Sequence, residues 1–411
     1  MMQGFTTRAI HGGLAEAEAH GALRVPVYDT VAFEQSDARS LQLAFEGRKP
    51  AHVYTRITNP TVREFEQKVR LLSGGLAVLA VSSGMAAIST TLLALAGAGT
   101  NIVTSRHLFG NTVSLLEKTL APWGLEVRYV DMTDTAEVQQ AMDGNTRALF
   151  LESITNPQLE VVDCARIAGI GAARNVPLVI DNTLMTPYLF DTARAGAAIE
   201  LLSSTKYISG GATSLGGIII DNGTFDWHHA PRLADSARKT GPMAFIASLR
   251  QAVHRDTGAC LAPHNAYLQS LGLETMSLRI NRSCANAMRL ARYLAGHPRV
   301  LAVHYPGLPD SPFHAMARRQ FGDRFGGILT FDLADRQSCF RLMDRLRLIR
   351  RATNINDNKT LILHPGSTIF AEYPEREQEA MGIRPTMLRL SAGIEDIDDI
   401  LTDLEEALQT P

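Results

Sequence analysis

Cysteine and net charge are both scarce in this chain of 411 residues. Its cysteines are Cys164, Cys260, Cys284 and Cys339, and no two are close enough in sequence for a CxxC redox pair or a zinc knuckle. The 40 lysines and arginines nearly balance the 42 aspartates and glutamates, which leaves a formal net charge of −2. We therefore expect no nucleic-acid partner, no disulfide framework and a reducing, cytoplasmic location.

Long apolar runs are missing as well. Residues 71–105 carry no charged side chain, but glycines, serines and threonines interrupt the stretch repeatedly. A membrane-spanning helix needs about 20 predominantly apolar residues in succession. The first residues, MMQGFTTRAIHGG, contain no apolar core of signal-peptide length. We expect no membrane span and no signal that directs the chain out of the cytosol.

Alternating strand and helix patterns fill the first half of the chain. Short aliphatic segments predict strands, and apolar residues at helical spacing predict helices. The expected strands cover 76–81, 102–103, 127–130, 149–151, 178–180 and 201–202, and the expected helices cover 85–95, 110–120, 134–142, 163–174 and 189–195. This alternation predicts an α/β fold in which helices flank both faces of a mostly parallel sheet.

The pattern changes after residue 221. A long helix over 264–296 and two short strands near 328–333 and 387–391 predict a smaller α+β domain. The first 55 or so residues show little periodicity and indicate an arm rather than a domain. We divide the chain into an arm at 1–58, a large domain at 59–255 and a C-terminal domain at 256–411.

Polar residues directly after the strands are the first candidates for chemistry, because ligands of parallel sheets bind beyond the carboxyl ends of the strands. These candidates are Ser82-Ser83-Gly84, Glu152-Ser153, Asp181-Asn182 and Ser203-Ser204-Thr205-Lys206. A glycine turn that opens a helix, as Gly84 does before Met85, can bind a cofactor phosphate through backbone amides, and Ser203 and Thr205 can add hydroxyl donors.

Lys206 and Asp181 are the most informative pair among them. A lysine can form a Schiff base with a carbonyl cofactor, and pyridoxal phosphate needs an acid that keeps its ring nitrogen protonated. Taken alone, Lys206 also fits a surface ion pair and Asp181 a helix N-cap. A strand-terminal acid followed one unit later by a strand-terminal lysine is much less expected by chance, and this pair favours pyridoxal phosphate.

Six motifs, in order over nearly the whole chain, resemble the Cys/Met metabolism family of pyridoxal-phosphate enzymes. They are Tyr54-Thr-Arg56-Ile-Thr-Asn59-Pro60-Thr61, Ser82-Ser-Gly-Met-Ala-Ala87, Glu152-Ser-Ile-Thr-Asn156-Pro157, Asp181-Asn-Thr183, Ser203-Ser-Thr-Lys-Tyr207 and Leu388-Arg-Leu-Ser-Ala-Gly-Ile-Glu395. The resemblance implies the type I aminotransferase fold. It also implies a homotetramer, built as a dimer of dimers that share active sites.

The same resemblance assigns roles to individual residues. Lys206 would be the Schiff-base lysine and Asp181 the partner of the pyridine nitrogen. The remaining cofactor-binding residues would be Gly84, Met85, Phe109, Ser203 and Thr205, with Tyr54 and Arg56 reaching in from the arm of the neighbouring subunit. The substrate would be bound by Arg389, which holds its α-carboxylate, by Asn156 and by Asn354. No metal site is expected.

Several positions distinguish the branches of this family. Phe109 stands where the lyases usually carry a tyrosine, Asn111 where methionine γ-lyases carry a cysteine, and Thr353 where cystathionine γ-lyases tend to carry a glutamate. The segment 218–256 resembles O-acetylhomoserine sulfhydrylases. These features favour γ-substitution on an O-acylhomoserine by sulfide or a thiol, giving homocysteine or methionine. A γ-lyase acting on methionine or cystathionine, or a cystathionine γ-synthase, remains the alternative, and the acyl group and the sulfur donor, including a protein sulfur carrier, stay open.

Four other interpretations fit the sequence less well. A nicotinamide dehydrogenase would need a full glycine fingerprint, whereas Gly169-Ile-Gly171 supplies two glycines inside a helical run. A noncatalytic relative would have lost Lys206 or Asp181, and both are present. Arginines over 341–351 interleave with leucines in the pattern of a helix with one solvated face, and RNA binding is the less favoured interpretation of this stripe. The adjacent His228 and His229 lack the spacing of metal ligands.

Overall fold

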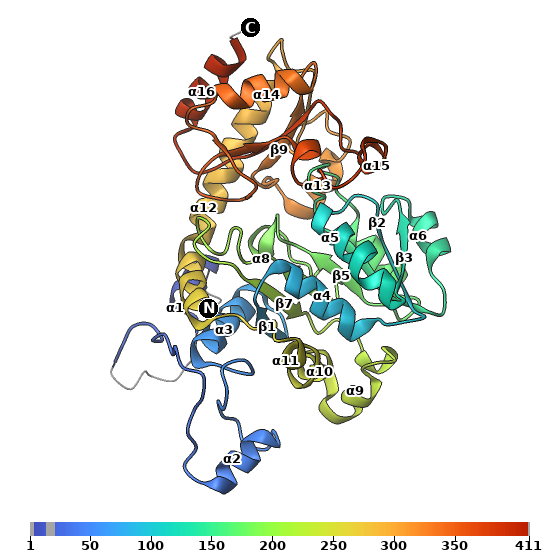
Figure 1. Ribbon diagram of the computed structural model, residues 1–411, viewed down its shortest axis with the longest axis vertical. Helices are drawn as coiled ribbons and strands as arrows, with labels where there is room; N and C mark the ends of the chain where they lie inside the picture. The colour runs from blue at the N-terminus through green and yellow to red at the C-terminus, as the bar shows by residue number, and fades with distance from the viewer. Residues whose placement is uncertain (1–3, 14–20, 410–411) are drawn as a thin grey trace.

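A twisted sheet of seven strands forms the larger part of the molecule in a computed structural model that describes residues 4–13 and 21–409 (Figure 1). The strand order is β1-β7-β6-β5-β4-β2-β3. The strands are β1 (Ala77–Val81), β2 (Asn101–Ser105), β3 (Glu126–Val130), β4 (Thr146–Glu152), β5 (Leu178–Asp181), β6 (Ile199–Leu202) and β7 (Gly217–Asp221). The neighbours among β2 to β6 pair in parallel, so the predicted mostly parallel sheet is confirmed.

One strand of this sheet was not predicted. β7 pairs antiparallel with both β1 and β6 and thereby places the edge strand β1 next to the rest of the sheet. Its residues Gly217–Asp221 are all buried and show no alternation of polar and apolar side chains. Since β7 follows β6 without an intervening helix, the βαβ rhythm that revealed the other strands is absent there.

Alternate residues of the strands enter two separate hydrophobic clusters, one on each face of the sheet. In β5, Leu178 and Ile180 pack into one cluster and Val179 into the other, as the period of two in a strand requires. The helices around this sheet are α3 (Pro60–Ser73), α4 (Gly84–Leu95), α5 (Gly110–Ser114), α6 (Thr135–Ala141), α7 (Cys164–Ala172), α8 (Thr186–Leu189), α9 (Ala234–Thr240), α10 (Ala244–Gln251) and α11 (Val253–Thr257).

Two helix predictions need correction. The segment predicted as one helix over 110–120 is α5 followed by a π-helical stretch, η1 (Leu115–Leu120). The helix predicted over 189–195 is wrong, because the helix there is the short α8, which ends at Leu189. Phe190 is extended instead and its carbonyl accepts a hydrogen bond from Asn182 Nδ2 at 3.2 Å, while Thr192 turns inward to donate to Glu200. Side-chain hydrogen bonds thus override the helical spacing.

The C-terminal part carries a second, mixed sheet of five strands in the order β10-β11-β12-β9-β8. They are β8 (Ala302–His304), β9 (Ile328–Asp332), β10 (Arg350–Arg351), β11 (Leu361–Leu363) and β12 (Met387–Ser391), and helices α13 (His314–Phe321), α14 (Arg336–Arg345), α15 (Glu375–Ala380) and α16 (Ile397–Gln409) accompany them. The predicted smaller α+β part is confirmed. The arginine-rich segment is not one helix, since α14 ends at Arg345 and Arg350 begins an edge strand.

The 33-residue helix α12 (Pro263–Ala295) runs from the large sheet to the small one (Figure 1). Its Gly272 lies against the backbone that follows Lys206, where an added Cβ would come within 2.0 Å of the Ile208 carbonyl oxygen. Only glycine allows this close approach of a helix to the lysine segment.

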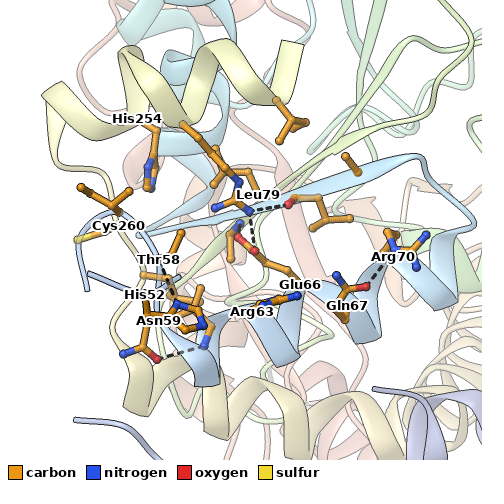
Figure 2. Close-up of a pocket in the computed structure, with 18 of the residues that line it drawn as sticks. His52, Thr58, Asn59, Arg63, Glu66, Gln67, Arg70, Leu79, His254 and Cys260 are labelled. Carbon is orange, nitrogen blue, oxygen red and sulfur yellow. Dashed lines mark hydrogen bonds and ion pairs between the residues drawn. The ribbon is translucent and has the colours of Figure 1, made fainter. Parts of the chain in front are cut away.

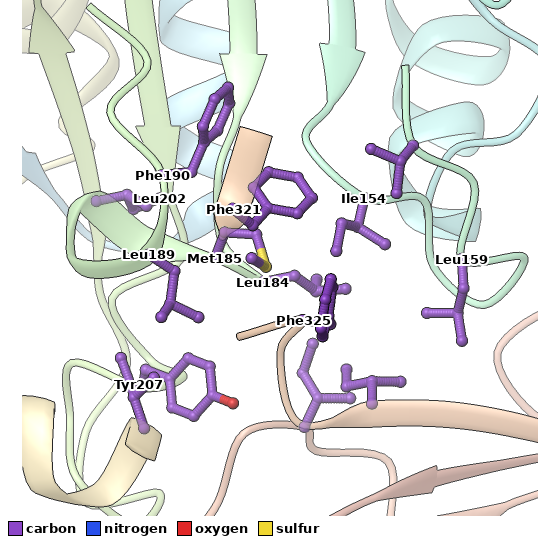
Figure 3. Close-up of a cluster of buried hydrophobic side chains, with 14 of the residues drawn as sticks. Ile154, Leu159, Leu184, Met185, Leu189, Phe190, Leu202, Tyr207, Phe321 and Phe325 are labelled. Atoms are coloured by element: carbon purple, nitrogen blue, oxygen red, sulfur yellow. The ribbon is translucent and has the colours of Figure 1, made fainter. Parts of the chain in front are cut away.

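The two sheets share one hydrophobic cluster, part of which Figure 3 shows. Leu184, Met185 and Phe190 follow β5, and Phe321 and Phe325 come from the small part. The rings of Phe190 and Phe321 meet edge to face with centroids 5.2 Å apart. This contact fixes the small part against the carboxyl ends of the large sheet, where the predicted site lies.

The N-terminal segment contains α1 (Phe5–His11) and α2 (Ala38–Phe45). Helix α1 packs on α3 and α12, whereas α2 projects from the body of the molecule (Figure 1). The domain boundaries at 58/59 and 255/256 stay predictions. Within the described residues, no helix has the length and apolar content needed to cross a membrane.

Candidate active site

A cavity of about 210 Å³ lies beyond the carboxyl ends of the large sheet. Eight predicted site residues line it: Gly84, Met85, Phe109, Asn156, Asp181, Ser203, Thr205 and Lys206. The other lining residues are Ser83, Ile88, Thr112, Glu152, Thr183, Leu184, Leu215 and Ile355. The topology brings these residues together, because β4, β5 and β6 end at the same edge.

Lys206 follows β6 and points into this cavity. Its Nζ donates a hydrogen bond to Asn354 Oδ1 at 2.7 Å, although Asn354 does not itself line the cavity. Burial lowers the pKa of the Lys206 ammonium to about 8; the Arg389 charge lowers it further and Asp357 opposes the shift. Far more of this amine is uncharged at neutral pH than of an ordinary lysine, and the uncharged form is the nucleophile.

Asp181 is the last residue of β5, and its Oδ1 accepts a hydrogen bond from the Thr183 amide at 2.9 Å. Burial raises the pKa of the Asp181 carboxyl, and the groups that shift it include no cation. A positively charged ring N–H set against this carboxyl would stabilise the carboxylate. The side chain therefore fits the partner of a pyridinium nitrogen.

A phosphate cradle lies at the start of α4. Ser83 caps the helix by accepting the Ala86 amide on Oγ at 3.0 Å. The amides of Gly84 and Met85 precede the first intrahelical hydrogen bond, which Ala87 donates to the Ser83 carbonyl. A Cβ on Gly84 would stand 2.6 Å from the Cβ of Ser203, so only glycine lets the two meet. Backbone amides and nearby hydroxyls thus converge where a phosphate would be held.

Arg389, on β12, is 2% exposed and reaches the site from the small sheet. Its Nη1 donates to Asn156 Oδ1 at 3.0 Å and its Nη2 to the Thr353 carbonyl at 3.1 Å. Its Nε has no hydrogen-bond partner among the described residues, and burial lowers the pKa of the guanidinium to about 9. A buried guanidinium with a free donor is suited to bind a carboxylate ligand.

Glu152 is the residue that the sequence placed at the right strand end without assigning it a role. Its carboxyl lines the cavity and accepts hydrogen bonds from the amides of Phe109, at 2.7 Å, and of Asn156, at 3.2 Å. The available signal was its position directly after a strand.

Tyr54 and Arg56 do not line this cavity. Arg56 donates to the Arg255 carbonyl at 2.6 Å, and its guanidinium lies 5.3 Å from the Tyr54 ring centroid. Arg56 instead lines a second cavity, of about 410 Å³, beside α3 and β1. Figure 2 shows His254 pointing into that cavity from one side and Glu66 of α3 from the other. In a single chain, the two arm residues thus lie away from Lys206.

Metal-ligating clusters of three or more histidine, cysteine or acidic side chains do not occur in the described part of the chain. His228 Nδ1 pairs with Asp226 at 2.7 Å, and both side chains are about half exposed or more. This pair lies at the start of η3 (Trp227–His229), where Asp226 is the capping residue, and lines none of the cavity around Lys206.

The set of residues fits pyridoxal phosphate on structural grounds: a buried lysine of lowered pKa, a buried carboxyl without a cation, and a helix start that only glycine can form beside Ser203. Gly169 and Gly171 lie inside α7, so the dehydrogenase fingerprint lacks its strand-to-helix turn.

Comparison with known proteins agrees with this fit. The model of the Cys/Met metabolism PLP-dependent enzymes matches residues 6–409. A solved structure from Campylobacter jejuni, provisionally named an O-acetylhomoserine (thiol)-lyase and carrying a pyridoxyl-lysine phosphate, is 32% identical, with a TM-score of 0.92 over 99% of this chain and 100% of its own. An O-acetylhomoserine sulfhydrylase structure from Wolinella succinogenes is 50% identical over 86% of this chain and 98% of its own, with a TM-score of 0.77. An L-methionine gamma-lyase from Pseudomonas putida is 36% identical over 99% of this chain and 98% of its own. The chain belongs to the Cys/Met metabolism family of enzymes, which depend on pyridoxal phosphate.

Proposed function

We propose that this enzyme replaces the acyloxy group on Cγ of an O-acylhomoserine, most favourably O-acetylhomoserine, with sulfide or a small thiol. The observation that carries the proposal is the aromatic residue at the cavity wall, Phe109, which has no phenol that could donate a proton to the leaving group. Expelling a thiolate, as the lyases do, benefits from a proton donor, whereas a carboxylate leaves readily without one. The similarity to O-acetylhomoserine sulfhydrylases supports the same choice.

The residues divide the work among them. Bound pyridoxal phosphate supplies an electron sink for the substrate's Cα. Arg389 and Asn156 would hold the α-carboxylate, and Asp181 would keep the proton on the ring nitrogen. The amine of Lys206 would accept the proton from Cα. Asn354, whose Oδ1 accepts a hydrogen bond from Lys206 Nζ at 2.7 Å, would orient that amine.

Steady-state assays of the holoenzyme test the proposal. We expect homocysteine formation from O-acetylhomoserine and sulfide at a kcat/KM at least about 10-fold above that for the succinyl ester, since a larger acyl group carries an extra charge into a cavity of about 210 Å³. Rapid release of α-ketobutyrate from methionine or cystathionine alone would contradict the proposal and favour the γ-lyase alternative.

The F109Y variant should gain lyase activity. A phenol at the cavity wall restores the proton donor that a thiolate leaving group needs, and such a donor contributes about 10²-fold or more to a rate. We expect α-ketobutyrate release from methionine to rise by at least about 10-fold. F150Y, at a fully buried strand position outside the cavity, is the matched control and should leave this rate unchanged. An unchanged rate in F109Y would show that the missing phenol is not what favours γ-substitution over the lyase reaction.

We also propose that Tyr54 and Arg56 complete the site of a neighbouring subunit in a homotetramer. Co-expressed R56A and K206A chains test this assignment. Each variant alone should be inactive, but mixed dimers would contain one intact site, so activity should recover to about a quarter of wild type. Co-expressed D181A and K206A chains serve as the control, because both residues lie in one cavity of one chain and no recovery is expected. Failure of the R56A and K206A pair to recover would place Arg56 in its own subunit's site or outside any site.

A further inference from the structure

Glu152 stands beside Asp181 at the end of the neighbouring strand. The two are paired in register where β4 and β5 run parallel, so their side chains point to the same face of the sheet. Both line the cavity that holds Lys206, and Glu152 is 6% exposed. A second buried carboxyl beside Asp181, the proposed partner of the ring nitrogen, would add a second negative charge there unless it has another role.

The contacts of Glu152 join two segments of the site. Its Oε1 accepts the amide of Phe109, the last residue before α5, and its Oε2 accepts the amide of Asn156 in the loop after β4. Asn156 in turn receives Arg389 on its side-chain oxygen at 3.0 Å. The Glu152 carboxyl therefore holds the backbone of Phe109, at the cavity wall, and that of Asn156, whose side chain contacts Arg389.

The charges around Glu152 favour its neutral form. The other titratable side chains that line the cavity, among the described residues, are Asp181 and Lys206, and Arg389 lies behind Asn156. Burial raises the pKa of the Glu152 carboxyl well above its usual range and the Asp181 charge adds to this, while the Phe109 and Asn156 amides oppose it. Two ionised carboxyls facing one ring cation would leave an uncompensated buried charge.

We propose that Glu152 is a positioning residue for the cofactor ring: as a neutral acid it fastens the Phe109 and Asn156 segments together and leaves Asp181 as the one anion opposite the ring nitrogen. The inference rests on pyridoxal-phosphate binding, which the family establishes, and not on the choice of substrate.

The E152Q and E152A variants test the two halves of this proposal by measurements on the bound cofactor. Glutamine is neutral and keeps the acceptor for the Phe109 amide, but its NH2 replaces the oxygen that accepts the Asn156 amide at the longer distance of 3.2 Å. E152Q should therefore bind pyridoxal phosphate within about 5-fold of wild type and keep the pH midpoint of its visible absorbance within about 0.3 unit. E152A removes both acceptors. It should weaken cofactor binding by at least about 10-fold and reduce the visible circular dichroism of the cofactor, which reports how the ring is held.

Glu200 offers a matched control. It is a buried carboxyl of β6, 2% exposed, that accepts Asn182 Nδ2 and Thr192 Oγ1 and does not line the cavity. E200A should lower the melting temperature but leave the dichroism and pH midpoint of the cofactor unchanged.

Two results would overturn the proposal. A pH midpoint that falls by about one unit or more in E152Q would mean that Glu152 carries a negative charge in the wild type. Wild-type cofactor affinity and dichroism in E152A would mean that the carboxyl does not position the ring. Neither readout depends on turnover, so both remain decisive even if the enzyme prefers another substrate.

Discussion

The K206A variant is expected to lose at least about 10⁴-fold in kcat, because in the proposed mechanism the same amine would anchor the cofactor and accept the substrate proton. The purified variant should bind pyridoxal phosphate without a covalent link, so borohydride reduction followed by mass spectrometry should find no modified lysine. The lowered pKa of about 8 makes this amine far more reactive than surface lysines, which should remain unmodified in both proteins.

Lys68 provides the matched control for this substitution. It is also a buried lysine, 6% exposed, but it lies on α3 and does not line the cavity. Its Nζ pairs with Glu274 at 3.5 Å. K68A should lower thermal stability while keeping the covalent cofactor and the kcat. Turnover by K206A close to the wild-type rate would refute the assignment of Lys206.

Replacing Arg389 should have the second-largest effect. The guanidinium is buried, its Nε has no hydrogen-bond partner in the described structure, and a substrate carboxylate would supply one. Loss of a buried charge partner costs about 2–5 kcal/mol, so kcat/KM should fall by about 30- to 5,000-fold in R389A. R389K keeps the charge without the planar fork and should fall by at least about 10-fold.

Arg279 is the control for Arg389. It too is a buried arginine, with a pKa lowered to about 10, but it donates to the Gly272 carbonyl at 2.7 Å and lies outside the cavity. R279K should change the melting temperature and leave KM unaltered. If R389A binds an amino-acid substrate as tightly as wild type does, Arg389 has no carboxylate to hold.

Most of the large sheet was predictable because, from β1 to β5, short aliphatic strands alternate with segments whose apolar residues recur at helical spacing. β7 lacked that rhythm, and its five buried residues give no alternation. The end of α8 was not predictable either, since hydrogen bonds from Asn182 and Thr192, formed only in the folded chain, decide the conformation of 190–195.

The site divides in a similar way. Lys206, Asp181 and Gly84 could be found from their positions after strands, because topology alone gathers those positions. Arg389 and Asn354 come from a different sheet and its loops, and only the family resemblance pointed to them. The linking role of Glu152 depends on two backbone amides far apart in sequence, which no local pattern encodes.

The contact at Gly272 makes the long helix a lever. At 1.5 Å per residue, the 23 residues from Gly272 to the end of α12 at Ala295 span roughly 35 Å, so a tilt of about 5° at the contact swings the far end by about 3 Å. Gly272 has no side chain to separate the two segments, so the backbone of α12 contacts the backbone of Ile208 and Ser209 directly. Any displacement of the smaller sheet that tilts α12 would therefore press directly on the backbone that follows Lys206.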